Sequence, residues 1–88
     1  MNKPYNEKKI SNNIFIREFS SNSYSAELVW HRDKEDRIIE PIGDNDWFIQ
    51  IDNELPKRIN EKIFIKKETF HRVIKGSDNL KIKLTKLF

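Results

Sequence analysis

The chain lacks cysteine altogether and has few glycines, few prolines and no long apolar run. Its 88 residues include two glycines and three prolines. The absence of cysteine excludes disulfide frameworks, thiolate zinc sites, iron–sulfur clusters and cysteine nucleophiles. Uninterrupted apolar runs are short, such as Trp47-Phe48-Ile49, whereas a transmembrane helix needs ~20 apolar residues, so no membrane span is predicted. Two glycines also leave no glycine-rich loop for binding a phosphate group.

The length of the chain fits one small domain. Residues 1–12 are polar and lack the apolar segment of a secretory signal. We therefore expect a polar N-terminal arm at 1–12, a single domain at 13–88 and a cytoplasmic location.

The charge of the chain is mixed rather than concentrated. The formal net charge is +3, but the signs alternate along His31–Arg37, as in an ordinary solvated surface. This pattern does not favour a nucleic-acid partner. Nucleic-acid binding nevertheless remains an alternative function. It would use the basic side chains Lys57, Arg58, Lys81 and Lys83.

Apolar residues recur with period two, which is typical of β-strands. The clearest case places Leu80, Ile82 and Leu84 on one face, with Lys81 and Lys83 on the other. Turn-forming residues separate the apolar segments, and no segment has a helical period. Strands are predicted at 14–19, 26–33, 37–42, 47–51, 62–66, 70–75 and 80–85. The fold class is therefore all-β, as a small antiparallel sandwich or barrel.

The two tryptophans and one glutamine have predicted positions within these strands. Trp47 shares a face with Ile49 and Ile51, which predicts a place in the core. Trp30 is expected to pack against a second sheet or a partner subunit. Gln50 alternates with the core face, and we expect it to line a pocket.

The two histidines and a neighbouring aspartate are the candidate metal ligands of this sequence. His31 and Asp33 are separated by one residue on a predicted strand, so their side chains point to the same face. His71 begins another predicted strand. If the fold brings that strand opposite, two imidazoles and one carboxylate face one point within ~5 Å. Such a triad binds iron, manganese, nickel or zinc and leaves coordination positions open.

Two other interpretations of these residues stay open. His31 and Asp33 also fit an ordinary surface ion pair, which contributes ~0–1 kcal/mol. Glu35 is an alternative third ligand if the strand continues past Asp33. Arg37 remains protonated and cannot bind a metal, so it either binds an anionic ligand or pairs with a neighbouring carboxylate of Asp33, Asp36 or Glu40.

Two segments of the chain resemble the conserved motifs of the cupins. In residues 60–74 a turn leads into an apolar strand, a second turn and His71, as in the second cupin motif. His31-Arg32-Asp33, followed by Arg37 and Gly43, resembles the first motif. The resemblance covers roughly residues 13–84.

The chain departs from the cupin pattern at several positions. Asp33 stands where the family has a second histidine, and Arg37 stands in the position of a glutamate. In the second motif, Lys66 replaces a proline and Glu68 replaces a glycine. A carboxylate in place of a histidine is a competent ligand for iron or manganese.

The resemblance implies a small double-stranded β-helix, a cupin-like jelly-roll barrel that is commonly a homodimer. It also implies a divalent metal bound inside, which we expect His31, Asp33 and His71 to hold. From the charge of Arg37 and the strand face of Gln50 we expect these two residues to bind a small-molecule substrate. The implied function is a metal-dependent enzyme of dioxygenase or isomerase type acting on a small anionic substrate.

The alternative function is a non-catalytic barrel with a vestigial metal site, which binds a ligand or a protein. The order of ligands is also similar to that of the 2-oxoglutarate-dependent oxygenases. Their co-substrate would need a basic residue such as Lys81, whose predicted strand face points outward. The sequence indicates no general base beyond Asp33.

Overall fold

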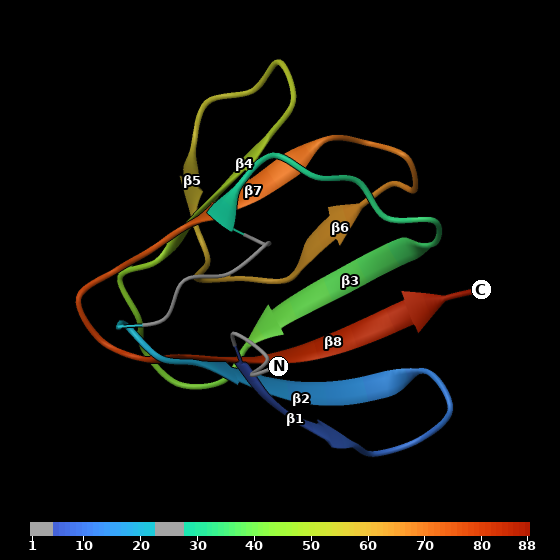
Figure 1. Ribbon diagram of the computed structural model, residues 1–88, viewed down its shortest axis with the longest axis horizontal. Coiled ribbons are helices and arrows are strands. Elements are labelled where there is room, and N and C mark those ends of the chain that lie inside the picture. Colours follow the sequence, from blue (N-terminus) through green and yellow to red (C-terminus); the bar gives the residue numbers. More distant parts are fainter. Residues whose placement is uncertain (1–4, 23–27) are drawn as a thin grey trace.

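The described part of the chain forms eight β-strands (Figure 1). A computed structural model describes residues 5–22 and 28–88, and within these ranges there is no α-helix. In the same ranges no helix is long and apolar enough to cross a bilayer. The strands are β1 (Tyr5–Lys9), β2 (Ile14–Phe19), β3 (Asp36–Pro41), β4 (Phe48–Ile51), β5 (Lys57–Arg58), β6 (Ile63–Ile65), β7 (His71–Ile74) and β8 (Leu80–Leu87). The all-β prediction is confirmed.

The strands form two antiparallel sheets. The larger sheet has the order β1-β2-β8-β3-β6, and the smaller has the order β5-β4-β7. Figure 1 shows the small sheet lying across from β3 and β8, with β6 between them at the edge of the large sheet. The last strand, β8, lies in the middle of the large sheet between β2 and β3, so strands distant in sequence are neighbours.

A single apolar core joins the inner faces of the two sheets. Leu80, Ile82 and Leu84 are buried as the alternation predicted, and Lys81 is exposed. Further core side chains come from both sheets and the loops between them: Phe19, Ile39, Trp47, Ile49, Ile59, Ile63, Ile65 and Val73. Because both faces of the core are apolar, their burial supplies the main driving force for closing the sandwich.

Strands β1 and β5 were missed by the period-two pattern. Residues 5–9, which the sequence analysis assigned to a polar arm, pair with β2 from Tyr5–Phe19 to Lys9–Phe15. An edge strand this polar has no apolar alternation to detect, and its backbone hydrogen bonds to β2 hold it. That residues 13–88 form a single domain stays a prediction.

The strand predicted at 26–33 is largely absent. Ala26 and Glu27 lie outside the described residues, and beyond them only His31 takes part in β-pairing, through one isolated bridge. The polar, charged run after His31 has no apolar face whose burial would favour an extended strand.

The turn between β6 and β7 carries an unusual backbone conformation. Glu68 has φ 59°, in the left-handed region that favours glycine. This is the position at which the sequence comparison with the cupin motif placed a glycine. The same turn leads into β7, which begins at His71. The strained backbone at Glu68 is therefore part of the turn that positions His71.

Replacing Glu68 tests this strain. Glu68→Gly should raise the free energy of unfolding by about 0.5–1 kcal/mol, because glycine adopts a positive φ without a Cβ clash. Glu68→Ala is the matched control, since it also removes the exposed contact to Arg32 but keeps the strain. Its stability should stay within about 0.5 kcal/mol of the parent. Urea unfolding measures all three, and a Glu68→Gly protein no more stable than Glu68→Ala would contradict the assignment.

Candidate metal centre

The centre of the site is a backbone pair between His31 and His71. His31 N donates to His71 O at 3.0 Å, and His71 N donates to His31 O at 2.8 Å. Residues paired directly across an antiparallel bridge project their side chains to the same face. The two imidazole rings accordingly lie with centroids 4.3 Å apart. The backbone therefore fixes how the two rings approach each other.

Each ring is oriented by a second backbone contact. His31 Nδ1 lies 2.9 Å from Val29 O, and His71 Nδ1 lies 2.8 Å from Thr69 O. A carbonyl oxygen only accepts, so each Nδ1 donates its hydrogen to the backbone and Nε2 is the ring nitrogen left for a metal. This arrangement, with Nδ1 tied to a carbonyl, is the one found in histidines that bind metals.

Asp33 completes the cluster from the loop after His31. Its Oδ2 lies 3.2 Å from His71 Nε2, and its side chain is 14% exposed. Glu68 N donates to Asp33 O at 2.7 Å, which aligns this loop with the β6–β7 turn. Among the described residues, this contact with His71 is the one that Asp33 Oδ2 makes, and no well-aligned hydrogen bond satisfies this buried oxygen.

The pKa of Asp33 lies below its ordinary value. Burial alone would raise the pKa of this carboxyl group, but the interaction with His71 and the positive charge of Arg37 outweigh it, with a further contribution from His31. The group is therefore an ionised carboxylate, the form that binds a metal.

These three side chains fit a divalent metal. One ligand atom from each of His31, Asp33 and His71 lies within 4.8 Å of the others. Metal–ligand bonds of ~2.0–2.2 Å hold two ligands no more than about 4.4 Å apart, so binding draws the side chains slightly closer. One carboxylate and two imidazoles, each with Nδ1 tied to the backbone, thus face one another. Such a set is satisfied by a cation.

Arg37 lies beside the cluster and is held by carboxylates. Its Nη2 is 2.7 Å from Glu35 Oε1 and 3.4 Å from Asp33 Oδ1, and its Nε donates to the same Glu35 oxygen at 2.8 Å. Of the partners that the sequence left open, Asp33 is observed, while Glu35 is an additional one. Glu35 thus binds Arg37 and is not part of the three-residue cluster.

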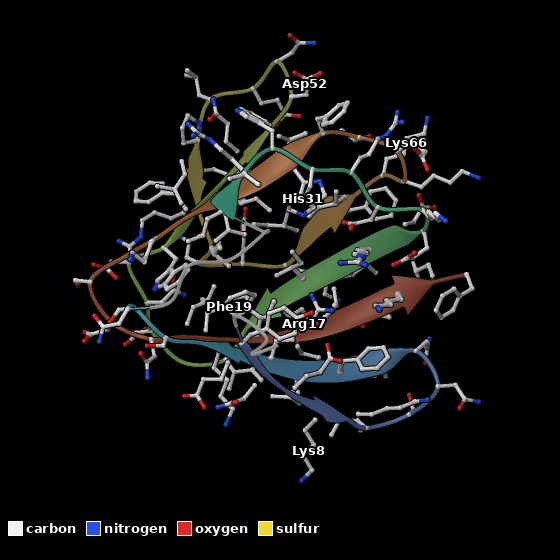
Figure 2. The ribbon with its side chains drawn as sticks, viewed as in Figure 1. Lys8, Arg17, Phe19, His31, Asp52 and Lys66 are labelled. Atoms are coloured by element: carbon white, nitrogen blue, oxygen red, sulfur yellow. The ribbon has the colours of Figure 1, made fainter. Side chains whose placement is uncertain are left out.

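A small cavity opens beside the histidines. Its volume is about 30 Å³, and it is lined by both rings, Arg37 and Arg17 together with apolar core side chains. The sequence analysis did not single out Arg17, although Phe15 and Phe19 flank it with period two and share its face. That alternation was a usable signal for an arginine inside the barrel (Figure 2).

Gln50 and Trp30 lie away from this cavity. On the outer face of the small sheet, Gln50 is paired with Arg72, whose Nε donates to Gln50 Oε1 at 3.1 Å. The structure does not bring Gln50 to the cluster, and a role for it in substrate binding stays a prediction. Trp30 is 44% exposed and lies 5.1 Å from the guanidinium carbon of Arg72, so no second sheet covers it.

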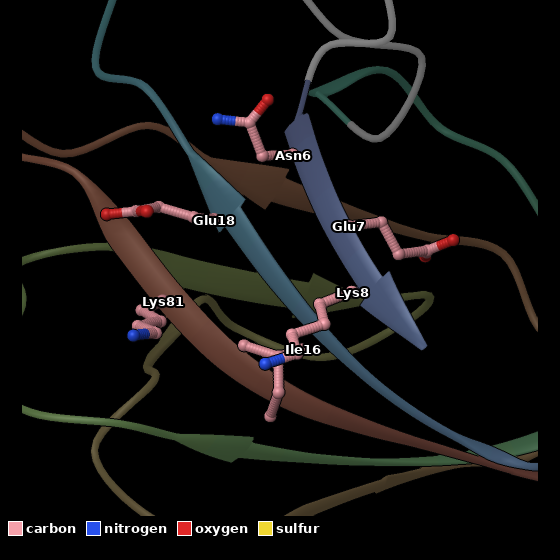
Figure 3. A pocket seen from close by; sticks show the side chains of 6 residues that line it. All are labelled: Asn6, Glu7, Lys8, Ile16, Glu18 and Lys81. Atoms are coloured by element: carbon pink, nitrogen blue, oxygen red, sulfur yellow. The ribbon is translucent and has the colours of Figure 1, made fainter. Parts of the chain in front are cut away.

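A larger hollow lies on the outer side of the large sheet (Figure 3). Its volume is about 230 Å³, and its lining combines acidic, basic and neutral side chains: Asn6, Glu7, Lys8, Ile16, Glu18 and Lys81. Glu7 already pairs with Arg17, and the other charged side chains, Lys8, Glu18 and Lys81, are exposed and of both signs, which is typical of a solvated surface. The interior cluster is therefore the stronger candidate site.

Solved structures with the cupin fold are similar to almost the whole chain. A cupin-2 domain containing protein from Shewanella frigidimarina is 17% identical with a TM-score of 0.64, and the match covers 96% of this chain and 81% of that one. A cupin domain from Bordetella pertussis is 12% identical with a TM-score of 0.63, over 100% and 99% of the two chains. KdgF from Halomonas sp. is 13% identical with a TM-score of 0.55, over 92% and 86%.

At these identities the likeness establishes the fold. The chain has the cupin fold, a jelly-roll barrel of two antiparallel sheets, and the predicted resemblance and fold class are confirmed. A scan against protein-family models and a search of curated proteins gave no match.

The depressed pKa of Asp33 has a measurable consequence in the metal-free protein. A carboxyl group whose pKa is lower in the folded state stabilises the fold above its unfolded pKa of ~3.9, and this contribution is lost as the pH falls through the folded pKa. Asp33→Asn should thus cost about 1 kcal/mol at pH 7, and the difference from the parent should shrink below about pH 4.

Urea unfolding between pH 7 and pH 3 measures this difference. Asp52→Asn is the control, because Asp52 is an exposed carboxylate on the turn after β4. Its stability should stay within about 0.5 kcal/mol of the parent throughout. A cost for Asp33→Asn that is equal at both ends of the pH range would contradict the assignment.

Proposed function

We propose that this chain is a small metal-binding protein of the cupin fold, with one divalent metal held by His31, Asp33 and His71. The observation that carries the proposal is the convergence of these three side chains within 4.8 Å, with both Nδ1 atoms on backbone carbonyls. The incomplete hydrogen bonding of the buried Asp33 Oδ2 supports it as well. Iron, manganese, nickel and zinc all suit two imidazoles and a carboxylate.

The proposed activity is that of a metal-dependent enzyme of dioxygenase or isomerase type on a small anionic substrate. A bound metal would supply polarisation of a substrate oxygen and open coordination positions. The protein's own contribution lies in its residues: His31 and His71 present Nε2, and Asp33 presents a carboxylate. Arg37 would orient the anion, since a guanidinium pairs with a carboxylate or phosphate in two-point geometry.

One observation favours the alternative of a non-catalytic barrel with a vestigial site. Arg37 already binds Glu35 and Asp33, and the cavity beside it has a volume of only about 30 Å³. Such a protein would bind a small ligand or a protein without turnover. The two functions differ in whether the protein needs a bound metal and consumes a substrate.

The homodimer and the cytoplasmic location remain part of the proposal. An exposed aromatic such as Trp30 is a suitable interface residue. Light scattering of the purified protein gives the mass in solution directly, against 10.6 kDa for one chain.

Metal content tests the proposed function. The protein is purified without a chelating tag, loaded separately with iron(II), manganese, nickel and zinc, desalted and measured by elemental mass spectrometry. About one metal per chain is expected for the parent. His31→Ala, His71→Ala and Asp33→Asn should each lower the affinity at least about tenfold, because each removes a ligand atom.

A second readout uses the scarcity of histidine. The chain has only two histidines, so nitrogen NMR of the rings shows two spin systems and zinc should shift Nε2 of both. Asp52→Asn is the exposed control and should bind metal as the parent does. A parent that holds none of the four metals, with unshifted ring signals, would overturn the proposal.

A further inference from the structure

The bridge between the two candidate histidine ligands also arranges their neighbours on the outer face of the molecule. His31 lies beside β7, at the edge of the small sheet (Figure 2). Successive residues of an extended chain project to opposite faces, and both histidines line the interior cavity. The residues next to them in sequence therefore point outward: Trp30, Arg32, Phe70 and Arg72. We call these four side chains the arginine–aromatic face.

Two cation–π contacts connect the members of this face. The guanidinium carbon of Arg72 lies 5.1 Å from the centre of the Trp30 ring, and that of Arg32 lies 5.4 Å from the centre of the Phe70 ring. These are the pairs that the antiparallel register of the bridge sets opposite each other. Trp30 and Phe70 are each 44% exposed. The face therefore presents two cations beside two aromatic rings that water still reaches.

Both guanidiniums of the face remain accessible to an anion. Arg72 Nε donates to the neutral amide oxygen of Gln50 at 3.1 Å, and among residues 5–22 and 28–88 no carboxylate forms an ion pair with Arg72. Arg32 lies 3.3 Å from a carboxylate oxygen of Glu68, but both of these side chains are more than half exposed. An ion pair this exposed contributes little free energy, so an arriving phosphate can displace Glu68 from Arg32.

A further arginine extends this surface across the small sheet. Arg58 on β5 is paired with Phe48 of β4, whose neighbour Ile49 is buried, so Arg58 lies on the outer face. Its guanidinium donates to a backbone oxygen at 2.6 Å, which is a neutral partner. By contrast, Lys81 and Lys83 lie on β8 of the large sheet. Of the basic residues that the sequence singled out for nucleic-acid binding, these two are therefore separated from the arginine–aromatic face.

We infer that the arginine–aromatic face binds single-stranded nucleic acid, with bases stacked on Trp30 and Phe70 and phosphates held by Arg32 and Arg72. Proteins bind single strands by this combination of exposed rings and cationic side chains, and a guanidinium matches the geometry of phosphate oxygens. An acidic peptide would pair with the arginines and leave the ring faces uncovered, and a duplex hides its base faces in the stack. The inference is independent of the proposed metal function, because these side chains point away from the metal cluster.

The test measures the affinity of the protein for a fluorescein-labelled oligothymidylate of about ten nucleotides, by fluorescence anisotropy. Saturable binding is expected at about 50 mM salt, and the affinity should fall about sevenfold by 200 mM, as two phosphate contacts require. A strand of the same length with abasic residues keeps the phosphates without the bases. This strand and a duplex of the same length should each bind at least about tenfold more weakly.

Tryptophan fluorescence gives a second readout of the same contact. Trp47 is fully buried, whereas Trp30 is 44% exposed, so quenching by unlabelled oligothymidylate reports stacking on Trp30. The abasic strand should leave this fluorescence nearly unchanged.

Variants separate the stacking contact from the charge. Trp30→Leu should weaken oligothymidylate binding at least about fivefold, whereas Trp30→Phe keeps a ring and should lose less than about threefold. Arg72→Gln should weaken binding several-fold and reduce the slope of log affinity against log salt by about 0.7. Glu68→Gln removes the carboxylate that competes for Arg32 and should strengthen binding. Lys81→Gln is the matched control for Arg72→Gln, since it removes the same charge from an exposed position on β8, and it should stay within twofold of the parent.

Several results would overturn the inference. They are a parent protein that does not bind oligothymidylate, an abasic strand or duplex that binds equally well, and a Lys81→Gln effect as large as that of Arg72→Gln. A second copy of the chain is the competing occupant, because Trp30 also suits a subunit interface. If Trp30→Leu lowers the mass in solution and leaves the affinity for the strand unchanged, the face is a subunit contact and the inference is wrong.

The affinity for oligothymidylate is measured with and without zinc, so that this inference and the proposed function fail separately. The two values should agree within twofold, because the face lies on the side of β7 opposite the metal cluster. A protein that binds the strand but no metal overturns only the proposed function. A strand that binds only the zinc-loaded protein would place the contact at the metal and overturn the inference.

Discussion

The site depends on one pair of backbone hydrogen bonds, the bridge between His31 and His71. A peptide pair of this kind fixes the distance between two Cα atoms far more tightly than side-chain packing does. The loop that carries His31 and Asp33 has no regular strand of its own. The bridge attaches this loop to β7. The position of His31 and Asp33 therefore depends on His71, the third candidate ligand.

The surrounding contacts leave these residues organised for a cation before one binds. Carbonyl oxygens hold both rings by Nδ1, and Arg37 lies near the other oxygen of Asp33. The three candidate ligand side chains therefore lie together before a metal binds, so binding would need little rearrangement of them.

The sequence predicted strands in which apolar residues alternate with polar ones, and it did not predict strands made largely of polar residues. The core strand at residues 80–84 was predicted correctly because Leu and Ile alternate with Lys. Polar β1 carries no such signal, and its register depends on tertiary pairing. The cluster was predicted from two histidines and a neighbouring aspartate, although the assumed strand at 26–33 is mostly a loop. The side chains converge through the bridge instead, and the interior position of Arg17 was overlooked because a charged residue was not considered for the core.

The pairing of Glu7 with Arg17 links strand β1, at the edge of the large sheet, to the electrostatics of the interior. Losing β1 would remove the carboxylate of Glu7, a negative charge that contacts the buried guanidinium of Arg17. Truncation of this strand would thus act as a change of electrostatic potential at the histidines, although none of its residues belongs to the metal cluster. Sequence change in this polar edge strand is therefore constrained by the chemistry of the interior as well as by the geometry of the sheet.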